Sequence, residues 1–291
     1  MKIEINEPQW YWQKGMRSNQ EDALYPLNYD ERHPFFIVCD GVGGNDCGEV
    51  ASHLVCESFG EFLPSRFEKD GQLDSHTFKE VLVHAWEKLY NNRKISQSMA
   101  TTLTFAAITN DGVFLAHMGD SRIYQIRPGE GEIFRTEDHS LVNELIKNKK
   151  ISPQEAVYHP KRHVITRCLT VQENSHNYTE ATVHIIRDVK PGDIFLLCSD
   201  GVYEEASGNY ITEVLSEDIS LSEKKEKLAQ TTFYSQDNNT AILLEINSVS
   251  KDKQDSEENI CFETHLSSYE IPSLLNQLSM SAQQWMRKFF K

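Results

Sequence analysis

Basic side chains are scarce in this chain, whose 291 residues include 29 lysines and arginines against 44 aspartates and glutamates. The formal net charge is −15 and the isoelectric point is near 5.2. A nucleic-acid-binding protein needs a basic face that meets the phosphates, so this charge argues against nucleic acid as a partner. An acidic balance fits a protein that gathers carboxylates to hold cations, although it more often serves solubility alone.

Long apolar runs and paired cysteines are absent as well. No stretch approaches the ~18 apolar residues of a membrane-spanning helix, and the N-terminal sequence MKIEINEPQW has no apolar signal core. None of the six cysteines belongs to a CxxC pair, and Cys39 and Cys198 lie within apolar runs, where a thiol behaves as a small hydrophobe. We therefore expect reduced cysteines and a cytoplasmic location.

Two short apolar runs end on aspartate and glycine: FFIVCDGVGG at 35–44 and IFLLCSDG at 194–201. Each run predicts a buried strand, which places the carboxylates of Asp40 and Asp200 at the rim of the core. An unpaired charge is costly in such a place, so we expect a partner that compensates it.

Hydrophobic periodicity predicts helices and strands in alternating groups. Helices are expected over 48–62, 75–94, 209–217 and 221–234. Two strands are expected within 1–27, with others over 35–40, 180–188, 193–198 and 239–246. Between them, 101–109, 112–120 and 122–128 predict a meander of adjacent antiparallel strands, and the polar segment 139–165 predicts a surface flap. The order favours an α+β fold, a four-layer αββα sandwich of two antiparallel sheets flanked by helix pairs.

The C-terminal part of the sequence has a different character. Residues 1–247 form the expected main domain, 248–268 a charged linker, and 269–291 an amphipathic helix with Leu274, Leu278 and Trp285 on one face. The final twenty residues contain Arg287, among other basic residues, and no acidic side chain. This helix either packs on its own domain or contacts a partner groove or an anionic membrane surface.

Further carboxylates stand beside strand ends: Glu21 and Asp22 after RSNQ, Asp120 in HMGDSRIY, and Asp237 in DNNTAILLEI. Each alone is typical of a turn or cap. Together they favour a hard divalent cation, because Mg²⁺ and Mn²⁺ prefer oxygen ligands. No histidine and cysteine set has the spacing of a soft-metal site. The glycine-rich stretch after Asp40 lacks the GK[ST] of a phosphate-binding P-loop and the EF-hand ligand pattern, but its Gly41 carbonyl could approach an ion.

Eight motifs in order carry a resemblance to a known family: RSNQEDA, VCDGVGG, ATTLTFA, HMGDSRIY, EDHSLV, HVITRCLT, CSDGVYE and DNNTAIL. Their order and spacing, over about residues 10–246, resemble those of the type 2C metal-dependent serine/threonine protein phosphatases. The DGVGG form and the short chain resemble the bacterial branch.

The resemblance implies a metal centre at matching positions. Asp40 would bridge two Mn²⁺ or Mg²⁺ ions. Asp200 and Asp237 would complete the coordination of the first ion, and Glu21 and the Gly41 carbonyl would bind the second. A hydroxide bridging the ions would attack phosphorus in line, so the family needs no serine or cysteine nucleophile.

The resemblance also implies roles around this centre. Asp120, with Asp200, would hold a third, weaker ion. Arg17 would clamp the substrate phosphate, and Asp22 would orient a metal-bound water. The expected substrates are phosphoserine and phosphothreonine proteins, those of a cognate serine/threonine kinase.

Three positions depart from the family pattern. Val42 stands where eukaryotic members carry a histidine that is a candidate general acid, so the acid stays unassigned. Ala100 and Thr170 replace glycines, which affects local backbone geometry and removes no ligand. Two alternatives stay open: a catalytically weak module that binds phosphoproteins or a partner, and an enzyme for small phosphorylated metabolites.

Overall fold

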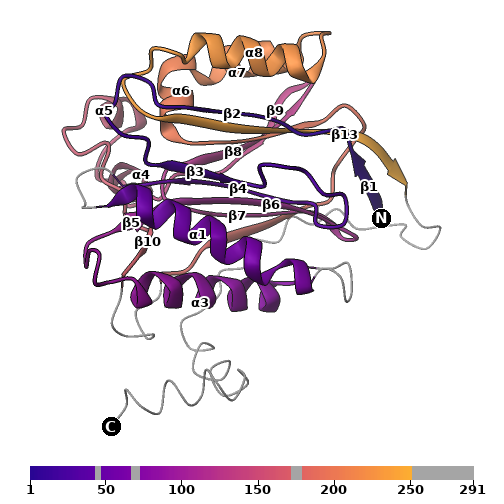
Figure 1. The fold of residues 1–291 in the computed structure, drawn as a ribbon. Helices are drawn as coiled ribbons and strands as arrows, with labels where there is room; N and C mark the ends of the chain where they lie inside the picture. Colours follow the sequence, from indigo (N-terminus) through magenta and orange to yellow (C-terminus); the bar gives the residue numbers. More distant parts are fainter. Residues whose placement is uncertain (43–46, 67–72, 172–178, 251–291) are drawn as a thin grey trace.

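The structure, a computed structural model, describes residues 1–42, 47–66, 73–171 and 179–250 (Figure 1). One antiparallel sheet has the strand order β11-β7-β6-β4-β3. Its strands are β3 (Asp22–Tyr25), β4 (Phe35–Asp40), β6 (Leu103–Thr109), β7 (Gly112–Met118) and β11 (Thr182–Ile186).

The second antiparallel sheet has the order β1-β13-β12-β8-β9, and β2 also pairs with β13. Its strands are β1 (Lys2–Ile5), β2 (Gln9–Gln13), β8 (Arg122–Arg127), β9 (Gly131–Arg135), β12 (Ile194–Cys198) and β13 (Asn239–Ser250). The two sheets pack face to face as the middle layers of the molecule (Figure 1).

Helices cover the outer face of each sheet (Figure 1). The first sheet is covered by α1 (Gly48–Phe62) and α3 (Ser75–Asn91), and the second by α6 (Asp200–Ala206), α7 (Gly208–Ser216) and α8 (Leu221–Thr231). This arrangement confirms the expected α+β sandwich, with helices outside two antiparallel sheets.

The apolar run of β4 is buried on both faces. Phe35 and Ile37 pack against α1 and α3, whereas Phe36 and Val38 pack against the second sheet. A strand between two apolar layers needs no polar alternation. The unbroken run FFIVC therefore follows from its place in the inner layers.

Three expected features differ in the structure. The residues of β8 do not continue the meander of β6 and β7, because the turn at Gly119 carries the chain into the other sheet. The N-terminal segment forms three strands where two were expected. A further helix, α6, begins at Asp200, where no helix was expected before residue 209.

The last strand also runs further than expected. β13 continues to Ser250 and pairs with β1, with Lys2 opposite Ser250. The folded domain therefore extends past the boundary expected at residue 247, since 248–250 are strand rather than linker. The remainder of the linker and the whole 269–291 helix lie outside the described residues and stay predictions. No helix among the described residues combines the length and apolar character needed to cross a membrane.

The segment 139–165 forms the expected flap, with α4 (Leu141–Lys147) and α5 (Pro153–Val157). Backbone hydrogen bonds join the two ends of this segment. The N–H of Leu141 donates to Val164 O at 2.8 Å, and that of Thr166 to His139 O at 2.7 Å. The N–H of His139 donates in turn to Gly119 O at 2.8 Å. The flap is thus anchored beside the turn that carries Asp120. Next to it, the short strands β5 (Ala100–Thr101) and β10 (Leu169–Thr170) pair with each other.

Candidate active site

One pocket of about 470 Å³ brings together seven of the eight site residues expected from the sequence. They come from the loop before β3, the end of β4, the turn after β7, the start of α6 and the loop before β13. These seven residues are Arg17, Glu21, Asp40, Gly41, Asp120, Asp200 and Asp237. The eighth, Asp22, lies behind the pocket.

The backbone of Asp40 is held by the two threonines of the ATTLTFA motif. Its N–H donates to Thr102 Oγ1 at 3.0 Å, and its carbonyl accepts from Thr101 Oγ1 at 2.9 Å and Thr102 N at 2.8 Å. Thr102 Oγ1 also lies 2.8 Å from Ser121 Oγ. These bonds fix the end of β4, so the Asp40 carboxylate enters the pocket from a rigid backbone.

Gly41 is required by the close approach of neighbouring backbone. A Cβ at this position would lie 2.5 Å from the carbonyl carbon of Gly48 and 2.8 Å from Glu21 O. The Gly41 N–H donates to the same Glu21 oxygen at 3.1 Å. No side chain fits there, which leaves the strand end open to the pocket.

Asn238 joins the loop that carries Arg17 and Glu21 to the start of β13. Its Oδ1 accepts from the Glu21 N–H at 2.8 Å, and its Nδ2 donates to Lys14 O at 2.8 Å and Asn19 O at 2.9 Å. A single amide therefore holds both ends of the loop. This residue was not singled out from the sequence, although it follows Asp237 in the DNNTAIL motif.

Asp22 is fully buried behind the pocket, opposite Asp40 in the β3–β4 pairing. Its Oδ2 accepts from Ser199 Oγ at 2.8 Å, whereas its Oδ1 has no hydrogen-bond partner among the described residues. Burial raises the pKa of Asp22 to about 7. A buried carboxylate oxygen without a hydrogen-bond donor is costly, and a water or a cation would satisfy it.

Burial and mutual repulsion both disfavour the charged form of the pocket carboxylates. Loss of hydration raises the pKa of Asp40 and of Asp200 well above the usual range, and neighbouring aspartates raise both further. Burial and Asp138 raise the pKa of Asp120 to about 6. The pKa of Glu21 is raised too, first by burial. A positive charge among these groups would remove the penalty.

Arg17 supplies part of that positive charge. Its guanidinium is 2.5 Å from Asp237 Oδ2, and this hydrogen bond raises the pKa of Arg17. Within the described ranges, no three Asp, Glu, His or Cys side chains are close enough to form a ready-made metal cage. The all-oxygen donor set and the orphaned Asp22 oxygen fit a hard divalent cation.

The turn that carries Asp120 is braced from α6. Tyr203 Oη donates to the Asp120 carbonyl at 3.1 Å, and the Arg122 guanidinium lies over the Tyr203 ring at 3.5 Å. Arg122 also makes a two-pronged ion pair with Asp138, with both contacts at 2.7 Å. The position of Asp120 therefore depends on the helix after Asp200 and on the base of the flap.

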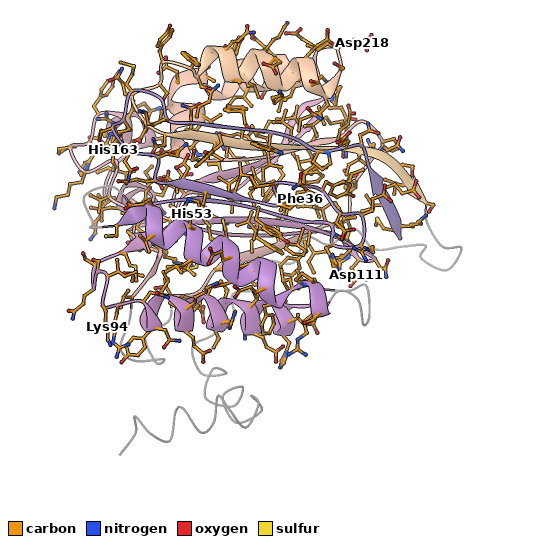
Figure 2. All side chains as sticks on the ribbon, in the orientation of Figure 1. Phe36, His53, Lys94, Asp111, His163 and Asp218 are labelled. Carbon is orange, nitrogen blue, oxygen red and sulfur yellow. The ribbon has the colours of Figure 1, made fainter. Side chains whose placement is uncertain are left out.

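Several pocket residues were missed by the sequence reasoning. They are Thr102, Arg162, His163, Ile165, Glu204 and Asn238. Arg162, His163 and Ile165 belong to the flap, which the sequence marks only as a polar surface segment. Glu204 had no signal, because its meeting with His163, at 3.5 Å, is a tertiary contact. Figure 2 labels His163 near the flap helix α5.

Comparison with known proteins decides the family. The family model described as protein phosphatase 2C matches residues 15–239. The chain belongs to this family. Protein phosphatase PhpP of Streptococcus pneumoniae is 35% identical over 225 residues, which cover 74% of this chain and 85% of that protein.

Solved structures agree with this assignment. The serine/threonine phosphatase PstP/Ppp of Mycobacterium tuberculosis superposes with a TM-score of 0.70 at 28% identity, covering 84% of this chain and all of that one. The catalytic domain of a PstP phosphatase in complex with two manganese ions gives a TM-score of 0.67 at 27% identity, with 84% and 99% covered. The motif resemblance is thereby confirmed: this chain is a metal-dependent serine/threonine protein phosphatase of the bacterial type. Its cofactor is Mn²⁺ or Mg²⁺.

Proposed function

We propose that this protein hydrolyses phosphoserine and phosphothreonine in proteins at the carboxylate pocket, with the following division of roles. Asp40, Asp200 and Asp237 would hold one divalent ion. Asp40, Glu21 and the Gly41 carbonyl would hold the second, and Asp120, with Asp200, would hold a third. The observation that carries this proposal is the convergence of these groups, from five separate segments, on one pocket.

Bound divalent cations supply two things at such a centre: a water of lowered pKa and neutralisation of the phosphate charge. The chain supplies the positions. Asp40 is fixed by the threonine bonds to its backbone, so its carboxylate stays between neighbours that repel it. Asp22, with Oδ2 held by Ser199, presents its other oxygen to accept and orient a water proton.

Arg17 binds the substrate phosphate in this scheme. Its guanidinium already points at the pocket carboxylate Asp237 and is half exposed. A planar fork of donors suits two oxygens of a phosphate, and the arginine keeps its charge at any working pH. Val42 lines the pocket and has no proton to give, so the leaving group takes its proton from another source.

The test is the steady-state hydrolysis of a phosphothreonine peptide in the presence of Mn²⁺. We expect Arg17→Ala to raise KM by about tenfold with a smaller loss in kcat, because the phosphate is held in both the ground and transition states. Arg187→Ala, a change outside the pocket, should leave both constants as in the wild type. An unchanged KM in Arg17→Ala, or full wild-type activity in excess chelator, would contradict the assignment.

Three wider proposals accompany the enzymatic one. The substrates are products of a cognate serine/threonine kinase, so loss of this phosphatase should increase phosphothreonine on that kinase's targets.

A cytoplasmic location is supported by the free thiols of the five described cysteines, and cell fractionation tests it. Residues 269–291 are proposed to contact a partner or an anionic membrane surface, which vesicle co-sedimentation of the full chain tests.

A further inference from the structure

The flap is basic in a protein that is otherwise acidic. Residues 139–165 contain five lysines and arginines against two glutamates, a net charge of +3 with histidines neutral, whereas the whole chain carries −15. All five basic residues are exposed: Lys147, Lys149, Lys150, Lys161 and Arg162. Charge of one sign on one exposed segment points to a partner of the other sign.

Arg162 and His163 bring this charge to the rim of the pocket, which both residues line. His163 lies 3.5 Å from Glu204, the pocket carboxylate that is not among the proposed metal ligands. Glu204 is therefore already paired with His163 of the flap. Over the described parts of the chain, no carboxylate lies within ion-pair distance of Arg162.

We infer that Arg162, with Lys161 beside it, binds acidic side chains that flank the phosphorylated residue, so that the enzyme prefers acidic phosphopeptides. This inference rests on the proposed function, since the phosphate must enter the same pocket. Arginine is suited to the task because its planar fork matches a carboxylate. At an exposed rim, such a contact contributes more to selectivity than to affinity.

A different role for Arg162, contact with the phosphate itself, predicts a different pattern of losses. The two roles separate when three substrates are compared. These are p-nitrophenyl phosphate, a phosphothreonine peptide with aspartates on both sides, and the same peptide with asparagines there. Only the flanking charge differs between the two peptides, and the first substrate has no flanking residues.

Arg162→Glu is the test variant, and Lys94→Glu is the matched charge reversal. Lys94 is exposed, follows α3 and lies well away from His163 in Figure 2. Steady-state kcat/KM is measured for wild type and both variants with saturating Mn²⁺ at low salt.

We expect the wild type to favour the aspartate peptide by about five- to tenfold, and Arg162→Glu to lose that preference. Its kcat/KM for the other two substrates should change less than about twofold, since neither presents a flanking charge. Lys94→Glu should behave as the wild type does. Raising the salt from about 0.05 to about 0.5 M should shrink the wild-type preference, because exposed charges are screened.

Two results would overturn the inference while leaving the phosphatase assignment intact. One is equal kcat/KM of the wild type for both peptides. The other is an equal loss on all three substrates in Arg162→Glu, which would place this arginine on the phosphate. Absence of Mn²⁺-dependent hydrolysis of every substrate by the wild type would instead defeat the proposed function, and the inference with it.

Discussion

The floor and the flap-side rim of the pocket are built in opposite ways. The floor carries the carboxylates of Glu21, Asp40, Asp120, Asp200 and Asp237, and the backbone of Asp40 is fixed at the end of β4 by two threonines. The rim carries Lys161, Arg162 and His163, which are exposed and follow the short helix α5. The floor therefore suits chemistry that is the same for every phosphate ester. The rim can change its side chains without disturbing the sheets, so it suits the choice between substrates.

The largest difference in activity between floor and rim variants is expected from a substitution in the floor. Asp200→Asn should lower kcat/KM by about 100-fold or more for all substrates, because even residues behind metal ligands commonly matter 10- to 100-fold. The matched change is Glu204→Gln in the same pocket, which is expected to keep activity within about threefold because Glu204 is not among the proposed metal ligands. Peptide hydrolysis with Mn²⁺ measures both. Equal losses of activity in the two variants would contradict the assignment of Asp200, and not Glu204, as a metal ligand.

A second prediction concerns stability without metal. The pKa of Asp120 is about 6 in the folded protein against an ordinary 3.8. The folded state therefore binds the extra proton between about pH 4 and pH 6, and this carboxylate destabilises the metal-free protein increasingly as pH rises through that window. Asp120→Asn should then stabilise the metal-free protein by about 3 kcal/mol at pH 7.5 and by almost nothing near pH 4.

The comparison of variant with wild type is necessary here because other buried groups act in the opposite sense. Burial lowers the pKa of His117 to about 4 and that of His139 to about 2, so both destabilise the fold as pH falls below 6.5. Their effect cancels in the difference between the two proteins. Urea denaturation in chelator at several pH values gives that difference, and a difference independent of pH would show that Asp120 is hydrated normally.

The smallest expected effect follows removal of residues 251–291. Every proposed ligand precedes Ser250, and β13 remains paired with β1 to that residue. Peptide phosphatase activity should therefore stay within about twofold of the full chain. The melting temperature separates the two roles of the tail, since loss of a docked helix lowers it and loss of a free one does not. A truncated protein that is folded but inactive would contradict the domain boundary.

The floor was largely predictable from the sequence and the rim was not. Asp40 follows a continuous apolar run, and a strand buried on both faces leaves that signature in any sequence. The eight motifs then identified the other floor residues. The pairing of His163 with Glu204 depends on how the flap meets α6, and no local pattern carries that information.

The differences between the expected fold and the observed one also arise from contacts that no local sequence pattern reveals. The turn at Gly119 has the local sequence of a hairpin, but the chain crosses there from one sheet to the other, and only the packing of the two layers decides this. Helix α6 was missed because Asp200 and Gly201 favour a turn when taken alone. In the structure they form the first turn of a helix whose carboxylate-bearing end faces the pocket.

The most direct test of the proposed metal centre is the Mn²⁺ dependence of phosphate release from a phosphothreonine peptide with neutral flanks, in wild type and Asp40→Asn. Asp40 is the carboxylate proposed to contact both ions, and asparagine keeps its size while removing its charge. We predict a rate that rises with Mn²⁺ in the wild type and falls to zero in chelator, with turnover abolished at every Mn²⁺ concentration in the folded variant. A variant that reaches the wild-type rate would contradict it.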